Sequence, residues 1–105
     1  PKLIIKYEDL ITNKELIIMQ IKNFFHENFG IKIKNYNKKL ENILATTNFD
    51  YMKQLENKVG FKEAKPWSTF FRKGKIGEWK DILNKTQQSK VENSFTEYMN
   101  KFEYY

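Results

Sequence analysis

Cysteine is absent from the 105 residues, and glycine, proline and histidine occur only four, two and one times. Without cysteine the chain can form neither disulfides nor thiolate metal sites, which fits a reducing compartment, so we expect a cytoplasmic protein. No apolar run reaches the ~18 residues of a transmembrane helix, and the start lacks the apolar core of a secretory signal. We therefore expect a soluble chain with no membrane partner.

Basic residues outnumber acidic ones, which gives a formal net charge of +6 and a pI of about 9.4. Such a balance predicts an anionic partner. It does not distinguish among a nucleic acid, a membrane surface and a phosphorylated cofactor.

The first residues indicate a buried strand. Leu3-Ile4-Ile5-Lys6-Tyr7 is apolar on nearly both faces, which is typical of a strand covered on both sides. No second strand pattern follows, so its hydrogen-bonding neighbours are expected in other sequence. The chain also begins with proline and runs directly into this apolar segment. We therefore expect a part of a larger domain.

Helical patterns dominate the rest of the chain. Thr12 and Glu15 have the spacing of a capping box, and Gly30 can end the helix that follows, with His26 capping its last carbonyls. Shorter helices are expected over residues 37–46 and 48–57, then a long loop over 58–77 and a brief helical turn near 79–83. Thr86 is the expected cap of a final helix. The apolar stripe of that final helix is Val91, Phe95, Tyr98 and Phe102.

The most informative segment lies at the end of the loop, where residues 71–80 read FRKGKIGEWK. The Arg72 guanidinium is a planar fork that matches phosphate oxygens, and Lys73 adds a point charge. Gly74 and Gly77 carry no Cβ, so backbone N–H groups can turn toward an anion. A helix starting near Glu78 would add its dipole. These features predict an anion site, although such a string is also common in solvated turns.

The spacing Arg-Lys-Gly, two residues, Gly, acid, Trp, Lys resembles the C-terminal signature of cytosolic sulfotransferases. The family usually has Asp where this chain has Glu78. The resemblance implies that Arg72, Lys73 and Gly74 hold the 3′-phosphate of the donor cosubstrate, 3′-phosphoadenosine 5′-phosphosulfate. It also implies an α/β fold: residues 1–105 would be the C-terminal part of one P-loop-type, three-layer sulfotransferase domain, mainly α-helical with one N-terminal strand when viewed alone.

Two further segments resemble the family's adenine site. Tyr7, in Tyr-Glu-Asp, and Thr47, Phe49 and Met52, in Thr-x-Phe-x-x-Met, match residues that border the base. Their types suit that role, since a ring stacks on a purine and a hydroxyl can bond its edge. Taken alone, Phe49 would be ordinary helix core.

Phe70 and Phe71 precede the basic motif, where the family often has Phe and Met. The resemblance implies that they line the cofactor rim. The other interpretation is that Trp67, Phe70 and Phe71 anchor a loose loop to the domain.

As a whole, the resemblance implies transfer of a sulfuryl group to a hydroxyl or amine acceptor. The family's phosphosulfate-loop lysine, its catalytic histidine and its acceptor pocket are not in this sequence, so the remaining N-terminal part of the domain is an expected partner and no catalytic residue or metal ligand is assigned here. Only Lys80 agrees with the family's dimer pattern, so the family-type homodimer is not expected. The alternatives are a basic nucleic-acid module and a purely helical interaction domain.

Overall fold

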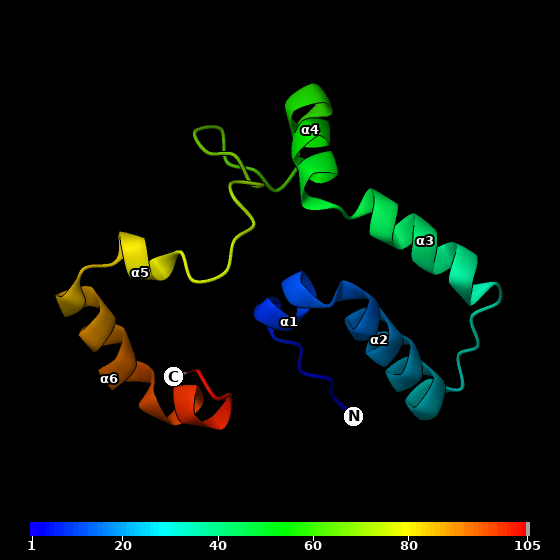
Figure 1. Cartoon of the computed structure of the whole chain (residues 1–105), viewed down its shortest axis with the longest axis horizontal. Coiled ribbons are helices and arrows are strands. Elements are labelled where there is room, and N and C mark those ends of the chain that lie inside the picture. The colour runs from blue at the N-terminus through cyan, green and yellow to red at the C-terminus, as the bar shows by residue number, and fades with distance from the viewer. Residues whose placement is uncertain (105) are drawn as a thin grey trace.

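The computed structural model of the chain, which describes residues 1–104, is built from helices (Figure 1). Within those residues there is no strand. None of their helices has the length and apolar character needed to cross a bilayer. The helices are α1 (Tyr7–Thr12), α2 (Lys14–Phe29), α3 (Tyr36–Thr46), α4 (Phe49–Val59), α5 (Trp79–Ile82) and α6 (Lys85–Lys101).

The strand predicted over residues 3–7 is not formed, and this part of the expected α/β fold is corrected. Lys6 does have extended backbone angles, with φ −80° and ψ 142°, but Tyr7 is already the first residue of α1. A strand needs a neighbour to accept its hydrogen bonds, and residues 1–104 offer none. Glu8 and Asp9 lie in the first turn of α1, where carboxylates favour a helix start.

The start of α2 also differs from the expected capping box. The cap is Asn13, whose side chain accepts a hydrogen bond from the Leu16 N–H at 3.3 Å. Thr12 ends α1 instead, and its hydroxyl donates to the Glu8 carbonyl at 2.9 Å. The predicted end is confirmed: Gly30 has φ 66°, and its N–H bonds to the His26 carbonyl. The His26 ring lies 3.3 Å from the Ile31 carbonyl, just past the helix.

Helices α3 and α4 lie within one or two residues of their predicted positions. Asn48 caps α4 by accepting the Tyr51 N–H at 3.2 Å. Helix α6 is capped by Asn84 rather than by the predicted Thr86. The Asn84 and Gln87 side chains each accept the other's backbone N–H, at 2.9 and 3.0 Å, which is a complete capping box. Phe95 departs from helical angles and kinks α6.

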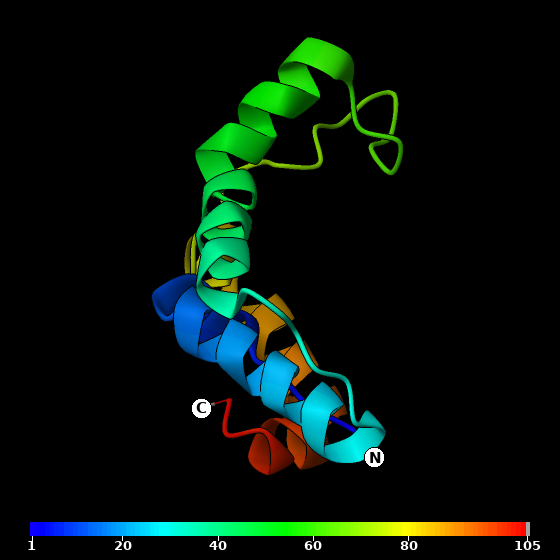
Figure 2. The same ribbon diagram turned by 90° about the vertical axis from the view of Figure 1, so that its right-hand side faces the viewer.

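The helices are spread in an open arrangement, with α4 and the loop that follows it at the top of the molecule in both views (Figures 1 and 2). The radius of gyration is 17.4 Å, well above the ~13 Å of a compact domain of this length. Close helix packing among residues 1–104 is confined to the consecutive pairs α1–α2, α2–α3 and α3–α4. Ile17 of α2 and Leu40 of α3 are the only buried apolar side chains described. The chain therefore has very little core of its own.

Candidate functional site

The first residue of α4 lies against the basic motif. The Phe49 ring packs directly on Gly74, so closely that a Cβ atom at position 74 would overlap the ring. Gly74 also has φ 63°, a left-handed conformation that side chains rarely adopt. The backbone angle and the ring contact both require glycine here. Two of the predicted site segments, 47–52 and 71–80, are thus in contact.

The Phe49 ring belongs to a cluster of four phenylalanine rings. Phe71 lies edge-on to Phe49 at 6.2 Å between centroids, and to Phe61 and Phe70 at 5.1 Å each. Phe61 and Phe70 are 4.7 Å apart. Such ring pairs stabilise the attachment of the loop to α4 by more than the free energy expected from the buried apolar area alone. Phe70 and Phe71 therefore do anchor the loop, whereas Trp67 is 81% exposed and does not.

Arg72 and Lys73 point at one carboxylate. The Arg72 Nη2 atom lies 2.9 Å from Oε2 of Glu78, and the Lys73 Nζ atom lies 3.0 Å from Oε1 of the same residue. The hydrogen bond from Lys73 lowers the pKa of Glu78, and the nearby charges of Arg72, Lys73 and Lys75 act in the same direction against the effect of burial. The two cations are thus arranged around a single oxyanion. Both remain more than half exposed to solvent.

One residue that shapes the loop was missed at the sequence level. Glu56 of α4 is buried, and its two carboxylate oxygens accept the N–H groups of Phe70 at 2.7 Å and Phe71 at 2.9 Å. One turn earlier on α4, Lys53 donates to the Arg72 carbonyl at 2.8 Å. The spacing of 53 and 56 does place both on one helix face. Nothing in the sequence shows that their partners are backbone atoms of a distant loop.

Thr47 and Met52 are close to the site but are not joined to the motif by any hydrogen bond described for residues 1–104. The Thr47 hydroxyl donates to the Ile43 carbonyl at 2.6 Å, and Lys14 of α2 donates to the Thr47 carbonyl at 2.7 Å. Met52 is half-buried on α4. Thr47 therefore contributes to the junction between α3 and α4.

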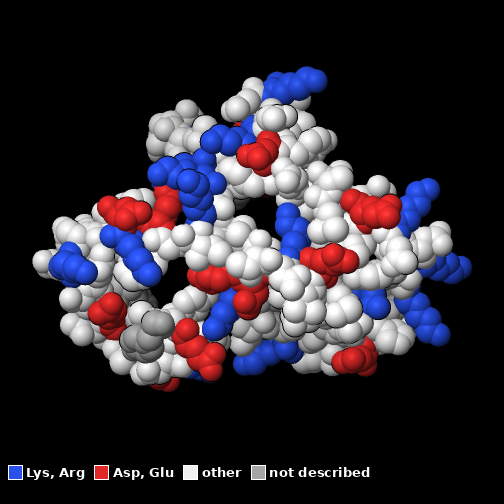
Figure 3. Space-filling model, viewed as in Figure 1, with Lys and Arg blue, Asp and Glu red and all other residues white. Residues whose placement is uncertain are grey.

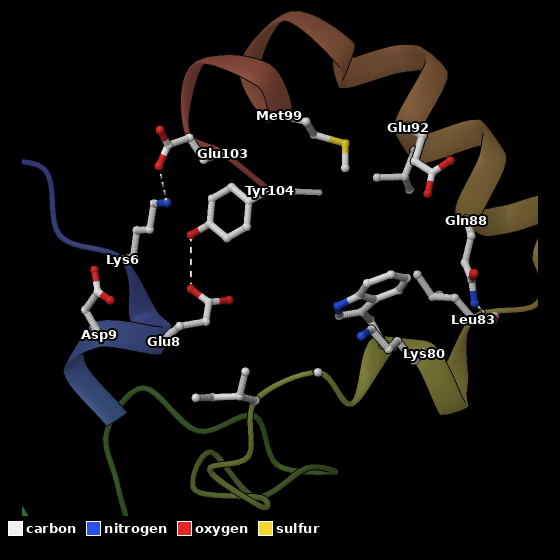
Figure 4. Close-up of a pocket in the computed structure, with 14 residues that line it drawn as sticks. Lys6, Glu8, Asp9, Lys80, Leu83, Gln88, Glu92, Met99, Glu103 and Tyr104 are labelled. Atoms are coloured by element: carbon white, nitrogen blue, oxygen red, sulfur yellow. Dashed lines mark hydrogen bonds and ion pairs between the residues drawn. The ribbon is translucent and has the colours of Figure 1, made fainter. Parts of the chain in front are cut away.

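Tyr7 is apart from the other predicted residues. It is 48% exposed, and within residues 1–104 no hydrogen bond or ring contact joins it to the motif. Its chain neighbours nevertheless face the motif across an open cavity of about 710 Å³ (Figure 4). There Tyr104 donates to Glu8 at 3.2 Å, and Lys6 pairs with Glu103 at 3.8 Å. Burial, followed by the bond to Glu8, raises the pKa of Tyr104.

Residues 2–103 match the model of the sulfotransferase domain family. Because the match covers nearly the whole chain, the protein belongs to this family. No curated protein and no solved structure gives a significant match. The family predicted from the basic motif is thereby confirmed, and the chain is a member with a mostly helical structure over the described residues.

Proposed function

We propose that this chain binds the nucleotide end of 3′-phosphoadenosine 5′-phosphosulfate in a sulfotransferase that acts on a hydroxyl or amine acceptor. The observation that supports this most is the pairing of Arg72 and Lys73 with both oxygens of Glu78. A guanidinium and an ammonium that converge on one oxyanion can receive a phosphate in the same way. The 3′-phosphate would take the place of the Glu78 carboxylate, with the backbone at Gly74 beside it.

The purine would lie near the Phe49 ring. Phe49 is half-buried and fixed by its contact with Gly74, so a ring and the phosphate site are held next to each other. A fixed ring provides a stacking surface at little entropic cost. Thr47 and Met52 lie within three positions of Phe49 along the chain, Phe71 contacts its ring, and Phe70 contacts Phe71. We propose that these residues line the base site and that Tyr7 closes it from α1.

These residues would position the donor and would not move protons. In the reaction, the acceptor oxygen or nitrogen attacks sulfur, the bond from sulfur to the 5′-phosphate oxygen breaks, and the acceptor's proton goes to a base. We propose that this base and the phosphosulfate-binding lysine belong to the remaining N-terminal part of the domain. Binding energy at the distant 3′-phosphate would hold and orient the donor, and its loss would change mainly the donor KM.

The same remaining part of the domain would cover the exposed apolar faces. Val91, Phe95 and Tyr98 of α6 are 43%, 53% and 57% exposed, which is unusual for an apolar stripe of one helix. We propose that residues 1–105 form the C-terminal part of one cytoplasmic sulfotransferase domain, without the family-type homodimer.

The test is the substitution Arg72→Ala in the full-length protein, measured as the KM for the donor. Loss of a charge-assisted contact is expected to raise this KM roughly 10- to 100-fold, with a smaller change in kcat. The matched control is Lys62→Ala, which removes one positive charge from an exposed residue of the same loop. Donor kinetics that are equal in the two variants would contradict the proposal.

Binding to nucleic acid is not expected, because acidic residues are interspersed with the basic ones on the face in Figure 3. The densest group of basic residues there lies by the loop before α5, directly beside acidic side chains. Single-stranded RNA that bound in the micromolar range with a steep salt dependence, while adenosine 3′,5′-bisphosphate did not bind, would favour the nucleic-acid module instead.

A further inference from the structure

A buried carboxylate holds the loop immediately before the basic motif. The exposed fraction of Glu56 is only 9%, and burying a charge is costly unless it is paired or hydrogen-bonded. Here each oxygen accepts one backbone N–H, from Phe70 at 2.7 Å and from Phe71 at 2.9 Å. Hydrogen bonds to a charged acceptor are about twice as strong as neutral ones, so this contact fixes the two peptide groups strongly.

The next residue along the loop is held by the same helix. Lys53 lies three positions before Glu56, and its ammonium donates to the Arg72 carbonyl at 2.8 Å. Residues 70, 71 and 72 are therefore bound in succession by two side chains on one face of α4. We call this set of three contacts the α4 clamp.

Helix α4 also carries the ring that faces the motif. Phe49 starts the helix, and Glu56 follows seven residues later, so a rigid helix separates them by ~10 Å along its axis. The ring contacts Gly74, and the clamp holds residues 70–72. The short segment that contains Arg72 is thus attached to α4 at both of its ends.

We propose that Glu56 is a positioning residue for donor binding. It acts through the backbone of Phe70 and Phe71, which determines the position of Arg72 relative to the Phe49 ring. This inference rests on the proposed function. Lys53 assists by fixing the Arg72 carbonyl. The ribose restricts the distance between the nucleotide's base and its 3′-phosphate to a narrow range, so affinity depends on keeping the ring and the cations at a matching distance.

The main variant is Glu56→Gln in the full-length protein. Glutamine keeps the shape but offers one acceptor oxygen, and its NH₂ group would face the second N–H. A milder variant, Lys53→Met, removes only the contact to the Arg72 carbonyl. The control is Glu63→Gln, which makes the same charge change at an exposed residue in the loop that follows α4. No ion pair or side-chain hydrogen bond of Glu63 is described for residues 1–104.

Three quantities are measured for each variant: hydrogen exchange at the Phe70 and Phe71 amides, the dissociation constant of adenosine 3′,5′-bisphosphate by calorimetry, and the donor KM and kcat. For Glu56→Gln we expect faster exchange at these amides and binding weakened about tenfold, with the donor KM raised and kcat nearly unchanged. Lys53→Met should weaken binding about two- to fivefold. Glu63→Gln should match the unaltered protein.

The outcomes separate this inference from the proposed function. Glu56→Gln with faster amide exchange but unchanged nucleotide affinity would overturn the positioning role and leave a structural contact. Equal losses in Glu56→Gln and Glu63→Gln would overturn it as well, since charge alone would then explain them. If the unaltered protein does not bind the nucleotide, the proposed function fails and the positioning role fails with it.

Discussion

The segment from α4 to Glu78 and helix α6 differ in how they are held. The first contains the α4 clamp, four contacting rings and two ion pairs. Helix α6 has a strong cap at Asn84, but within residues 1–104 it has no close packing with another helix. Its attachments nearby are the Lys6 pair with Glu103 and the Tyr104 bond to Glu8.

This difference indicates that the two regions obtain their order from different sources. The basic motif is held by side-chain contacts between α4 and its loop, although little apolar surface is buried there. Helix α6 is specified by local signals, and its apolar stripe remains exposed. In the proposed function the first region binds the donor, while the second contributes a face that the rest of the domain would cover.

The largest expected effect comes from Gly74→Ala, which would push the loop away from α4. Alanine must adopt a left-handed conformation and its methyl group would overlap the Phe49 ring, so we expect a loss of about 2 to 4 kcal/mol in the free energy of unfolding. Urea unfolding measures this change in the free energy of unfolding. Gly77→Ala is the matched control, because Gly77 has φ 78° with open space where the Cβ would be, and it should lose only ~1 kcal/mol. Equal losses would mean that the ring contact does not hold the loop.

A smaller effect is expected at Glu78, because both cations it binds are more than half exposed. Its pKa is lowered in the folded chain, so its contribution to stability is present above about pH 4.5, the ordinary value, and is lost as the pH falls through the lowered pKa. Thermal unfolding as a function of pH should show a larger loss in the unaltered protein than in Glu78→Gln, and the difference between the two is the contribution of Glu78.

The same Glu78→Gln variant should bind adenosine 3′,5′-bisphosphate a few-fold more tightly at neutral pH, because Arg72 and Lys73 are then freed from a competing carboxylate. High salt should reduce the difference, since exposed charges are screened. Weaker binding would show instead that Glu78 is needed to orient the cations.

The smallest effect is expected at Phe95, on the exposed stripe of α6. Phe95→Ser in the 105-residue chain should change the free energy of unfolding by no more than ~0.5 kcal/mol, because the side chain is 53% exposed and its backbone is already non-helical. Urea unfolding checks this. A loss as large as that of Gly74→Ala would mean that α6 is already packed, and the contrast between the two regions would disappear.

Helix positions and the basic motif were readable from the sequence because their signals are local. Gly30 ends α2 as predicted, and the long loop before α5 was expected from its glycines and proline. The errors at the helix starts are local competitions between similar signals: Asn13 caps α2 where Thr12 is expected, and Asn84 caps α6 where Thr86 is expected. Asn and Thr both cap well, so the sequence does not decide which one the backbone uses.

The amino-acid sequence by itself determined the family, the helical character and the position of the basic motif, since these depend on spacings of a few positions. Tertiary structure alone decided that Tyr7 begins a helix, that Glu78 holds Arg72 and Lys73, and that Glu56 binds a loop 14 and 15 residues away. The physical reason is that a carboxylate can accept a hydrogen bond from any N–H group or pair with any cation. Only the folded backbone determines which of these groups is within reach.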